Sequence, residues 1–257
     1  MKLYSTGVIA VVCDALICDW NGTITKYPDE KPLMEQIAID IFKTSIPFHL
    51  LRVVRLITAR RKLNALYNGK RCDDGFDYII EMFKIYNERI ILGLPVSIIN
   101  NSVDRYATRQ QTLADLDHRI LAVVKTCHQT GKTTGIFSAG YKDGIQKVLG
   151  AAGLEDHFDF CVGDSLKTRD GKAIEFELKL YKRKPTLLAN LLKERNLDPR
   201  TVAYIGDSED DEGCFDIVGY PVMSFFASEE LKQKCAWKYN AFVPKDEQDL
   251  MNHLGFD

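Results

Sequence analysis

The chain has 257 residues, 46% of them hydrophobic and 27% charged, with a formal net charge of −2. This composition predicts a soluble globular protein of one or two domains, and the charge balance argues against nucleic acid or a membrane surface as a partner. Seven cysteines without any C-x-x-C pair predict a reduced, cytoplasmic chain. No stretch reaches the roughly 18 apolar residues of a membrane helix, and the apolar segment 7–13 is too short for a signal peptide.

The first predicted strand is the apolar run at 15–18, and a polar loop follows it directly. This loop begins with Asp19, Trp20, Asn21, Gly22 and Thr23. Glycine allows a tight turn whose backbone N–H groups can cradle a phosphate, and a carboxylate such as Asp19 can attack phosphorus to form an aspartyl-phosphate. The alternative is an Asx-type turn that only ends the strand. Trp20 is expected to form a wall of the pocket or part of the core.

The segment 29–112 lacks a strong strand signal. Apolar residues at helical spacing, punctuated by proline and glycine, predict helices at 32–42, 50–66, 76–91 and 97–112. An all-helical block therefore interrupts the chain after its first strand. The block carries several basic side chains, which are Arg52, Arg55, Arg60, Arg61, Lys62, Lys70 and Arg71. We interpret them first as a solvated helix face, with recognition of an anionic substrate tail as the alternative.

The rest of the chain alternates strands with helices. Strands are expected at 134–137, 158–162, 202–205 and 222–226, and helices at 113–128, 144–152, 185–195, 228–234 and 248–254. A hairpin is expected at 167–180. This alternation predicts an α/β fold, a Rossmann-like doubly wound parallel sheet with an inserted all-helical cap domain. The predicted division is core at 1–28, cap at 29–112 and core again at 113–257.

Three more polar segments lie at strand ends or helix starts. Ser138, followed by Ala139 and Gly140, could bind phosphoryl oxygens, although a helix N-cap is the simpler interpretation of Ser138. Lys184 could neutralise a phosphate or the Asp19 carboxylate, although a solvated lysine is common and its two neighbours, Lys182 and Arg183, compete for the role.

The last of these segments carries acidic residues. Asp207 and Asp211 follow the predicted strand 202–205, where a metal near Asp19 could be held. Asp210 and Asp211 could instead be first-turn acids that a helix dipole favours. The four segments together, in the order Asp, Ser, Lys, Asp, predict a single site for Mg²⁺ and phosphate.

This constellation resembles the haloacid dehalogenase-like (HAD) superfamily of phosphohydrolases over roughly residues 8–28 and 113–250. The family's four motifs correspond to the segment at Asp19, to Ser138, to Lys184, and to Asp207 with Asp211. The second half resembles the phosphoserine phosphatase branch, and the helical insert stands where that branch has its cap. The resemblance implies Asp19 as nucleophile and Mg²⁺ held by Asp19, Asp207, Asp211 and the backbone carbonyl of Asn21. It also implies phosphate binding by Gly22, Thr23, Ser138, Ala139, Gly140 and Lys184.

Asn21 departs from the family pattern, because family phosphatases carry a second aspartate there that acts as general acid and base. An amide cannot exchange a proton usefully near neutral pH. Candidates for a replacement are His49 and the cap carboxylates Asp29, Glu30 and Asp77. We therefore predict a Mg²⁺-dependent hydrolase of a small phosphorylated metabolite, impaired by Asn21; the alternative is a weak or inactive relative that binds a phosphorylated ligand or a protein partner. The remaining histidines, His118, His128, His157 and His253, lack metal-ligand spacing.

Overall fold

The computed structural model describes residues 13–45, 50–68 and 77–256. Its centre is a parallel five-stranded sheet in the order β3-β2-β1-β6-β7. The strands are β1 (Ala15–Cys18), β2 (Thr133–Tyr141), β3 (Phe160–Asp164), β6 (Val202–Gly206) and β7 (Tyr220–Met223). The predicted α/β fold is confirmed. Among the described residues, no helix is long and apolar enough to cross a membrane.

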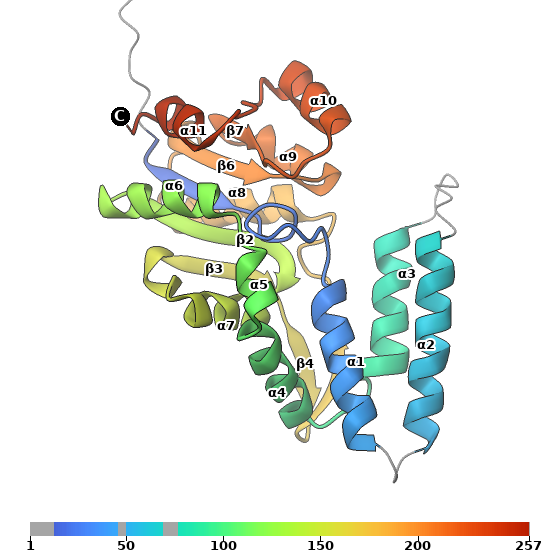
Figure 1. Cartoon of the computed structure of the whole chain (residues 1–257). Helices are drawn as coiled ribbons and strands as arrows, with labels where there is room; N and C mark the ends of the chain where they lie inside the picture. The colour runs from blue at the N-terminus through green and yellow to red at the C-terminus, as the bar shows by residue number, and fades with distance from the viewer. Residues whose placement is uncertain (1–12, 46–49, 69–76, 257) are drawn as a thin grey trace, which may run out of the picture.

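Helices cover both faces of the sheet (Figure 1). One layer contains α6 (His118–Gln129), α7 (Lys142–Ala152) and α11 (Glu247–Leu254); the other contains α8 (Lys184–Glu194), α9 (Glu212–Phe215) and α10 (Glu229–Tyr239). Successive side chains of a strand point to opposite faces, so Leu16 and Cys18 join one core cluster while Ala15 and Ile17 join the other. Burial on both faces explains why this strand is apolar at every position.

The insert after β1 is helical, as expected, and stands beside the sheet (Figure 1). It consists of α1 (Lys31–Ser45), α2 (Leu50–Asn68), α3 (Tyr78–Ile85), a π-helical turn η1 (Tyr86–Ile91), α4 (Val96–Ala107) and α5 (Gln110–Ala114). The helices predicted at 76–91 and 97–112 are therefore each divided in two. Most of its buried apolar side chains form a cluster of their own, whereas Ala107 at the end of α4 joins a cluster of the sheet.

Several predicted boundaries were wrong for local reasons. The helix expected at 113–128 begins only at His118, because the carboxylate of Asp117 accepts a hydrogen bond from the Arg119 N–H and caps the helix there. Strand β2 continues past residue 137 to Tyr141, and β7 ends at Met223 rather than at residue 226. The extension of β2 contains Ser138, Ala139 and Gly140, which therefore lie at the carboxyl end of this inner strand.

The hairpin β4 (Leu166–Arg169) and β5 (Lys172–Phe176) joins the insert to the core. The Asn87 amide donates to the Phe176 carbonyl at 3.0 Å and accepts from the Phe176 N–H at 2.8 Å. The Val96 N–H donates to the Gly171 carbonyl at 2.9 Å. Ala173 and Phe176 also pack in the cap cluster. The hairpin therefore packs as part of the cap, although its sequence lies in the segment predicted as core; the division at 28/29 and 112/113 stays a prediction.

Candidate active site

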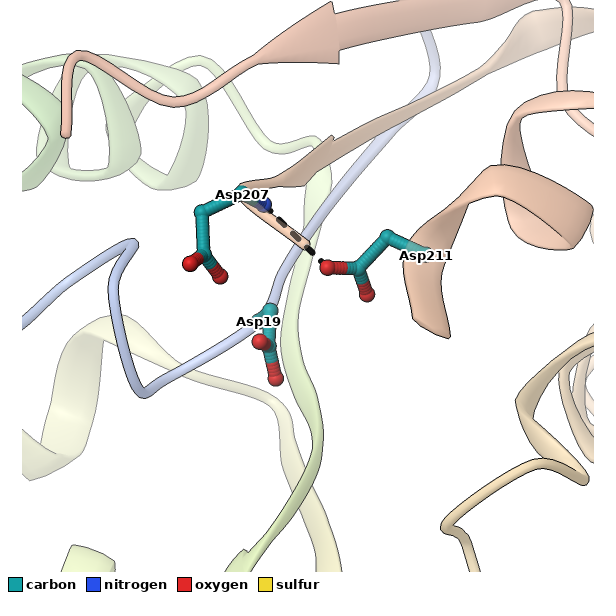
Figure 2. A group of neighbouring side chains, drawn as sticks. All are labelled: Asp19, Asp207 and Asp211. Carbon is teal, nitrogen blue, oxygen red and sulfur yellow. Dashed lines mark hydrogen bonds between the residues drawn. The ribbon is translucent and has the colours of Figure 1, made fainter. Parts of the chain in front are cut away.

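Asp19 lies just past the carboxyl end of β1, where its N–H donates to the Ile205 carbonyl of the neighbouring strand at 2.9 Å. Asp207 and Asp211 follow β6 at the same edge of the sheet. Figure 2 shows the three carboxylates gathered there, and oxygens from all three lie within 4.8 Å of one another. The structure thus brings together two segments that are far apart in the sequence, as the parallel topology predicts.

Gly22 fits a space that no other residue could occupy. Its φ is +67°, and a Cβ there would lie 2.0 Å from Oδ2 of Asp207. The next residue, Thr23, is fully buried, and its hydroxyl donates to Oδ1 of Asp207 at 3.4 Å. The tight turn therefore holds Asp207 beside the loop that carries Asp19. This packing, and not only turn geometry, explains the glycine.

Asp211 is fully buried, and both of its oxygens accept hydrogen bonds. Oδ1 accepts from Lys184 and from the Tyr204 hydroxyl, each at 2.7 Å. Oδ2 accepts from the backbone N–H groups of Asp207 and Ser208, each at 3.1 Å, and from the Ser208 hydroxyl at 2.8 Å. Its coordination of a metal stays a prediction; what the contacts establish is that Asp211 orients Lys184 and the backbone that carries Asp207.

Lys184 is the buried cation of the site. Its ammonium lies 3.3 Å from Asp19 and 2.7 Å from Asp211, and only 2% of the residue is exposed. Pro185 stands in the first turn of α8, which begins at Lys184. Of the three adjacent basic residues, Lys182 and Arg183 are exposed, so the structure selects Lys184 as the partner of Asp19.

Ser138 is 1% exposed and does not cap the following helix, whose N-cap is Tyr141. Its hydroxyl accepts from the Gly140 N–H at 3.0 Å and also forms a hydrogen bond with Asp19. Ala139 and Gly140 line the same cavity as Asp19. These positions are where the sequence analysis placed a phosphate-binding segment.

Asn21 contacts one of the candidate replacement acids. Its amide donates to Oε1 of Glu30 at 3.2 Å, and the Tyr141 N–H donates to the same oxygen at 3.0 Å. Burial raises the pKa of Glu30 to about 7, against the effect of these two hydrogen bonds. Asp29 lines the same cavity as Asp19. Asp77 accepts a hydrogen bond from the hydroxyl of Tyr181, which also lines that cavity. His49 lies outside the described residues.

Negative charge in the site exceeds the charge that Lys184 can balance. Burial, and then the charges of Asp211 and Asp19, raise the pKa of Asp207 well above its usual value. Burial likewise raises the pKa of Asp19 to about 6, although Lys184 opposes this shift. Oδ1 of Asp19 is buried, and the Lys184 ammonium lies 3.3 Å from it as an ion pair without a hydrogen bond. Carboxylate oxygens from three side chains within 4.8 Å of one another suit a hard divalent cation, so the residues present fit Mg²⁺.

A cavity of about 660 Å³ opens from these groups toward the insert. Its apolar wall is formed by Ile79, Met82, Phe83, Leu178 and Tyr181. Trp20 is 4% exposed and packs in the sheet core, so of its two predicted places it occupies the core. The basic side chains that the structure describes on α2 do not line this cavity, which favours the solvated-face interpretation for them; Lys70 and Arg71 lie outside the described residues.

Comparisons with known proteins agree with this geometry. A family model described as haloacid dehalogenase-like hydrolase matches residues 13–213, and no curated protein sequence matches the chain. A substrate-bound phosphoserine phosphatase is similar in structure, with a TM-score of 0.57 at 15% identity over 86% of this chain and 90% of that one.

Two further solved structures share the fold. Cytosolic 5'-nucleotidase IIIB bound to cytidine has a TM-score of 0.61 at 17% identity, over 94% of this chain and 84% of that one. A HAD family hydrolase from Salmonella enterica subsp. enterica serovar Typhi has a TM-score of 0.62 at 15% identity, over 96% and 72%. At these identities the structures establish the fold alone, whereas the family model spans most of the sequence. The chain therefore belongs to the haloacid dehalogenase-like hydrolases.

Proposed function

We propose that this protein is a Mg²⁺-dependent phosphatase that acts on a small phosphorylated metabolite through an aspartyl-phosphate at Asp19. The observation that carries the proposal is the placement of Asp19, ion-paired to buried Lys184 and beside Asp207, at the floor of a cavity large enough for a metabolite. A cavity of several hundred Å³ with a few convergent polar groups is typical of a small-molecule site.

The chain's own residues suit the nucleophilic attack and the binding of the phosphoryl group, whereas the protons exchange with solvent. An oxygen of Asp19 forms a bond to phosphorus while the bond from phosphorus to the substrate oxygen breaks, and the departing alcohol takes up a proton. Water then attacks phosphorus, which releases phosphate and restores Asp19. Lys184 and the hydroxyl of Ser138 stabilise the charge on the phosphoryl oxygens, from positions already fixed by their buried contacts.

Asp19, Asp207 and the backbone carbonyl of Asn21 would hold Mg²⁺, with Asp211 supporting them through Lys184 and the Asp207 backbone. When bound, the ion supplies Lewis-acid polarisation of the phosphoryl group. The excess negative charge around Asp207 supports this assignment, since a cation would relieve it.

Asn21 limits which substrates react well. General acid–base catalysis contributes about 10²–10⁴-fold, and an amide cannot supply it. Phosphoesters whose leaving groups need little protonation, such as aryl and acyl phosphates, should therefore react best. If the protein is instead an inactive binding protein, these same compounds should bind without being hydrolysed.

The test is hydrolysis of an aryl phosphate with and without Mg²⁺, together with a search for a phosphoenzyme by intact mass. We expect metal-dependent phosphate release and a mass increase of one phosphoryl group. Binding of inorganic phosphate without any turnover or phosphoenzyme, over a broad panel of activated donors, would contradict an enzymatic role.

A further inference from the structure

The cavity at the active site carries an unusual charge distribution. Seven carboxyl groups line it, which are those of Asp19, Asp29, Glu30, Asp207, Glu209, Asp210 and Glu230, against the ammonium groups of Lys182, Lys184 and Lys234. Among the described residues, no arginine reaches it. The carboxylates of Asp19 and Asp207 belong to the reaction site. Glu30 contacts Asn21, and Asp210 lies 3.8 Å from Lys184. The other three, Asp29, Glu209 and Glu230, line the rest of the cavity.

Each of the three ammonium groups already has a carboxylate partner. Lys184 contacts Asp19 and Asp211, Lys182 forms an ion pair with Asp77, and Lys234 lies 2.5 Å from Glu212. A second anionic group on a substrate would have to displace one of these partners. It would also enter a region of like charge, which costs free energy.

Two carboxylates at the cavity mouth are differently placed. Glu209, in the turn after β6, and Glu230, at the start of α10, are both exposed, and neither forms a side-chain hydrogen bond or ion pair with another described residue. Glu209 lies close enough to Tyr181 and Lys234 to perturb both electrostatically. These two side chains are therefore available to a cationic group at the open end of the cavity.

We infer that this site selects phosphomonoesters whose leaving group is apolar or carries an amine, and that it rejects those bearing a carboxylate or a second phosphate. Ile79, Met82 and Phe83 on the cap would contact a methylene chain, while Glu209 and Glu230 would attract an ammonium group at its end. The inference rests on the proposed phosphate site at Asp19, and it names the class of substrate for that site.

The test uses three non-hydrolysable phosphonates of matched length, 3-aminopropylphosphonate, propylphosphonate and 2-carboxyethylphosphonate, titrated calorimetrically with Mg²⁺ present. Binding is measured, so the result does not depend on turnover. We expect the amine to bind about tenfold more tightly than the carboxylate, with the neutral compound between them. Equal or tighter binding of the carboxylate would overturn the inference.

Binding of inorganic phosphate distinguishes a failure of the substrate-class inference from a failure of the proposed phosphate site. If phosphate binds but the three phosphonates do not bind in this order, the inference fails and the phosphate site stands. If phosphate also fails to bind, both fail.

Paired variants locate the preference. Glu209→Gln combined with Glu230→Gln should reduce the amine-to-carboxylate affinity ratio about threefold, and less at high ionic strength, because exposed charges are screened by salt. Glu35→Gln is the matched control, since Glu35 is an exposed carboxylate on α1 that lines a different cavity. An unchanged ratio in the double variant would contradict the role of these two carboxylates.

Discussion

The core side of the active site and its cap side are built differently. On the core side Asp19, Asp207, Asp211 and Lys184 are buried or nearly so, and Asp211 and Lys184 bind one another directly. On the cap side the cavity wall consists mainly of apolar side chains on α3 and on the loop after β5. The core therefore holds its polar side chains in place through direct hydrogen bonds and ion pairs, whereas the cap contributes the shape and the hydrophobic area of the cavity.

This difference indicates which substitutions each side tolerates. A buried charge that loses its partner costs about 3–5 kcal/mol, so the core residues depend on one another. Volume-conserving exchanges among apolar residues usually cost less than about 1.5 kcal/mol. The chemistry should thus be sensitive to single changes in the core, and substrate choice should respond gradually to changes in the cap.

Removal of the nucleophile should have the largest effect. Asp19→Asn keeps the size of the side chain but cannot form the aspartyl-phosphate, so we expect turnover of an aryl phosphate to fall by more than about 10³-fold. The phosphoenzyme should disappear from the mass spectrum in the same variant. A labelled phosphoryl group that persists on the protein would show that another residue is the nucleophile.

Asn21→Asp should act in the opposite direction. With an activated donor, the wild-type protein should form phosphoenzyme in a burst and hydrolyse it slowly, because Asn21 cannot activate water. The aspartate should shorten the life of the intermediate and raise turnover by about 10²-fold or more. Rapid linear turnover without a burst in the wild type would contradict slow dephosphorylation.

Glu30 supplies a paired variant for that experiment. Asn21 donates to Glu30, so Asn21→Asp alone brings two carboxyl groups together, which favours protonation of one of them. Asn21→Asp combined with Glu30→Gln restores an amide–carboxylate pair. We expect the double variant to retain the gain down to lower pH than the single variant, because its aspartate ionises without a neighbouring carboxylate. The measurement is the pH profile of turnover.

Asp164 connects the core to the hairpin that packs on the cap. Oδ1 accepts from the Lys179 and Leu180 N–H groups, while Oδ2 is buried without a partner. Burial raises the pKa of Asp164 to about 6, and Lys179 and Glu177 are its charged neighbours. The folded carboxyl thus holds its proton at pH values where the unfolded one has released it, so the free energy of unfolding should decrease as pH rises from about 4 to 6.

Asp164→Asn should remove this pH dependence. The difference in unfolding free energy between pH 4 and pH 7, measured by urea denaturation, should shrink by roughly 1–3 kcal/mol. Asp156→Asn, which changes an exposed carboxylate near β3, serves as control. An identical pH dependence in wild type and Asp164→Asn would contradict the raised pKa.

Asp77 joins the cap to the cavity mouth and should give the smallest effect. Its side chain caps α3 by accepting from the Ile80 N–H, accepts the Tyr181 hydroxyl at 2.9 Å and pairs with Lys182. Asp77→Ser keeps the helix cap but is too short for the other two contacts. We expect KM for an aryl phosphate to rise about threefold to tenfold with kcat little changed.

Asp77→Asn refines that test, since it keeps the cap and the acceptor for Tyr181 but loses the charge that pairs with Lys182. Its KM should lie between those of the wild type and Asp77→Ser. A serine variant that matches the wild type would show that these contacts do not shape the site.

The sequence alone predicted which residues meet on the core side of the site. Parallel strands place their carboxyl ends at one edge, so Asp19, Ser138 and Asp207 could be assigned to one site from the strand pattern and the family motifs. Gly22 and Lys184 were predicted in the same way, because they lie next to a strand end or a helix start. Most core elements were predicted within a few residues. The five-residue error at the start of the helix predicted at 113–128 arose because a single cap at Asp117 outweighed the apolar pattern.

Other features of the site were decided only by the tertiary structure, because they depend on residues that packing brings together. The sequence left four candidates for the missing acid, and only the fold placed Glu30 against Asn21. The sequence prediction assigned the hairpin to the core, whereas hydrogen bonds between Asn87 and Phe176 tie the hairpin to the cap. Lys182 pairs with Asp77 and Lys234 pairs with Glu212, in each case between separate elements. These pairings leave Glu209 and Glu230 without a cationic partner at the cavity mouth. Such contacts have no local sequence signal, because each depends on the relative placement of whole elements.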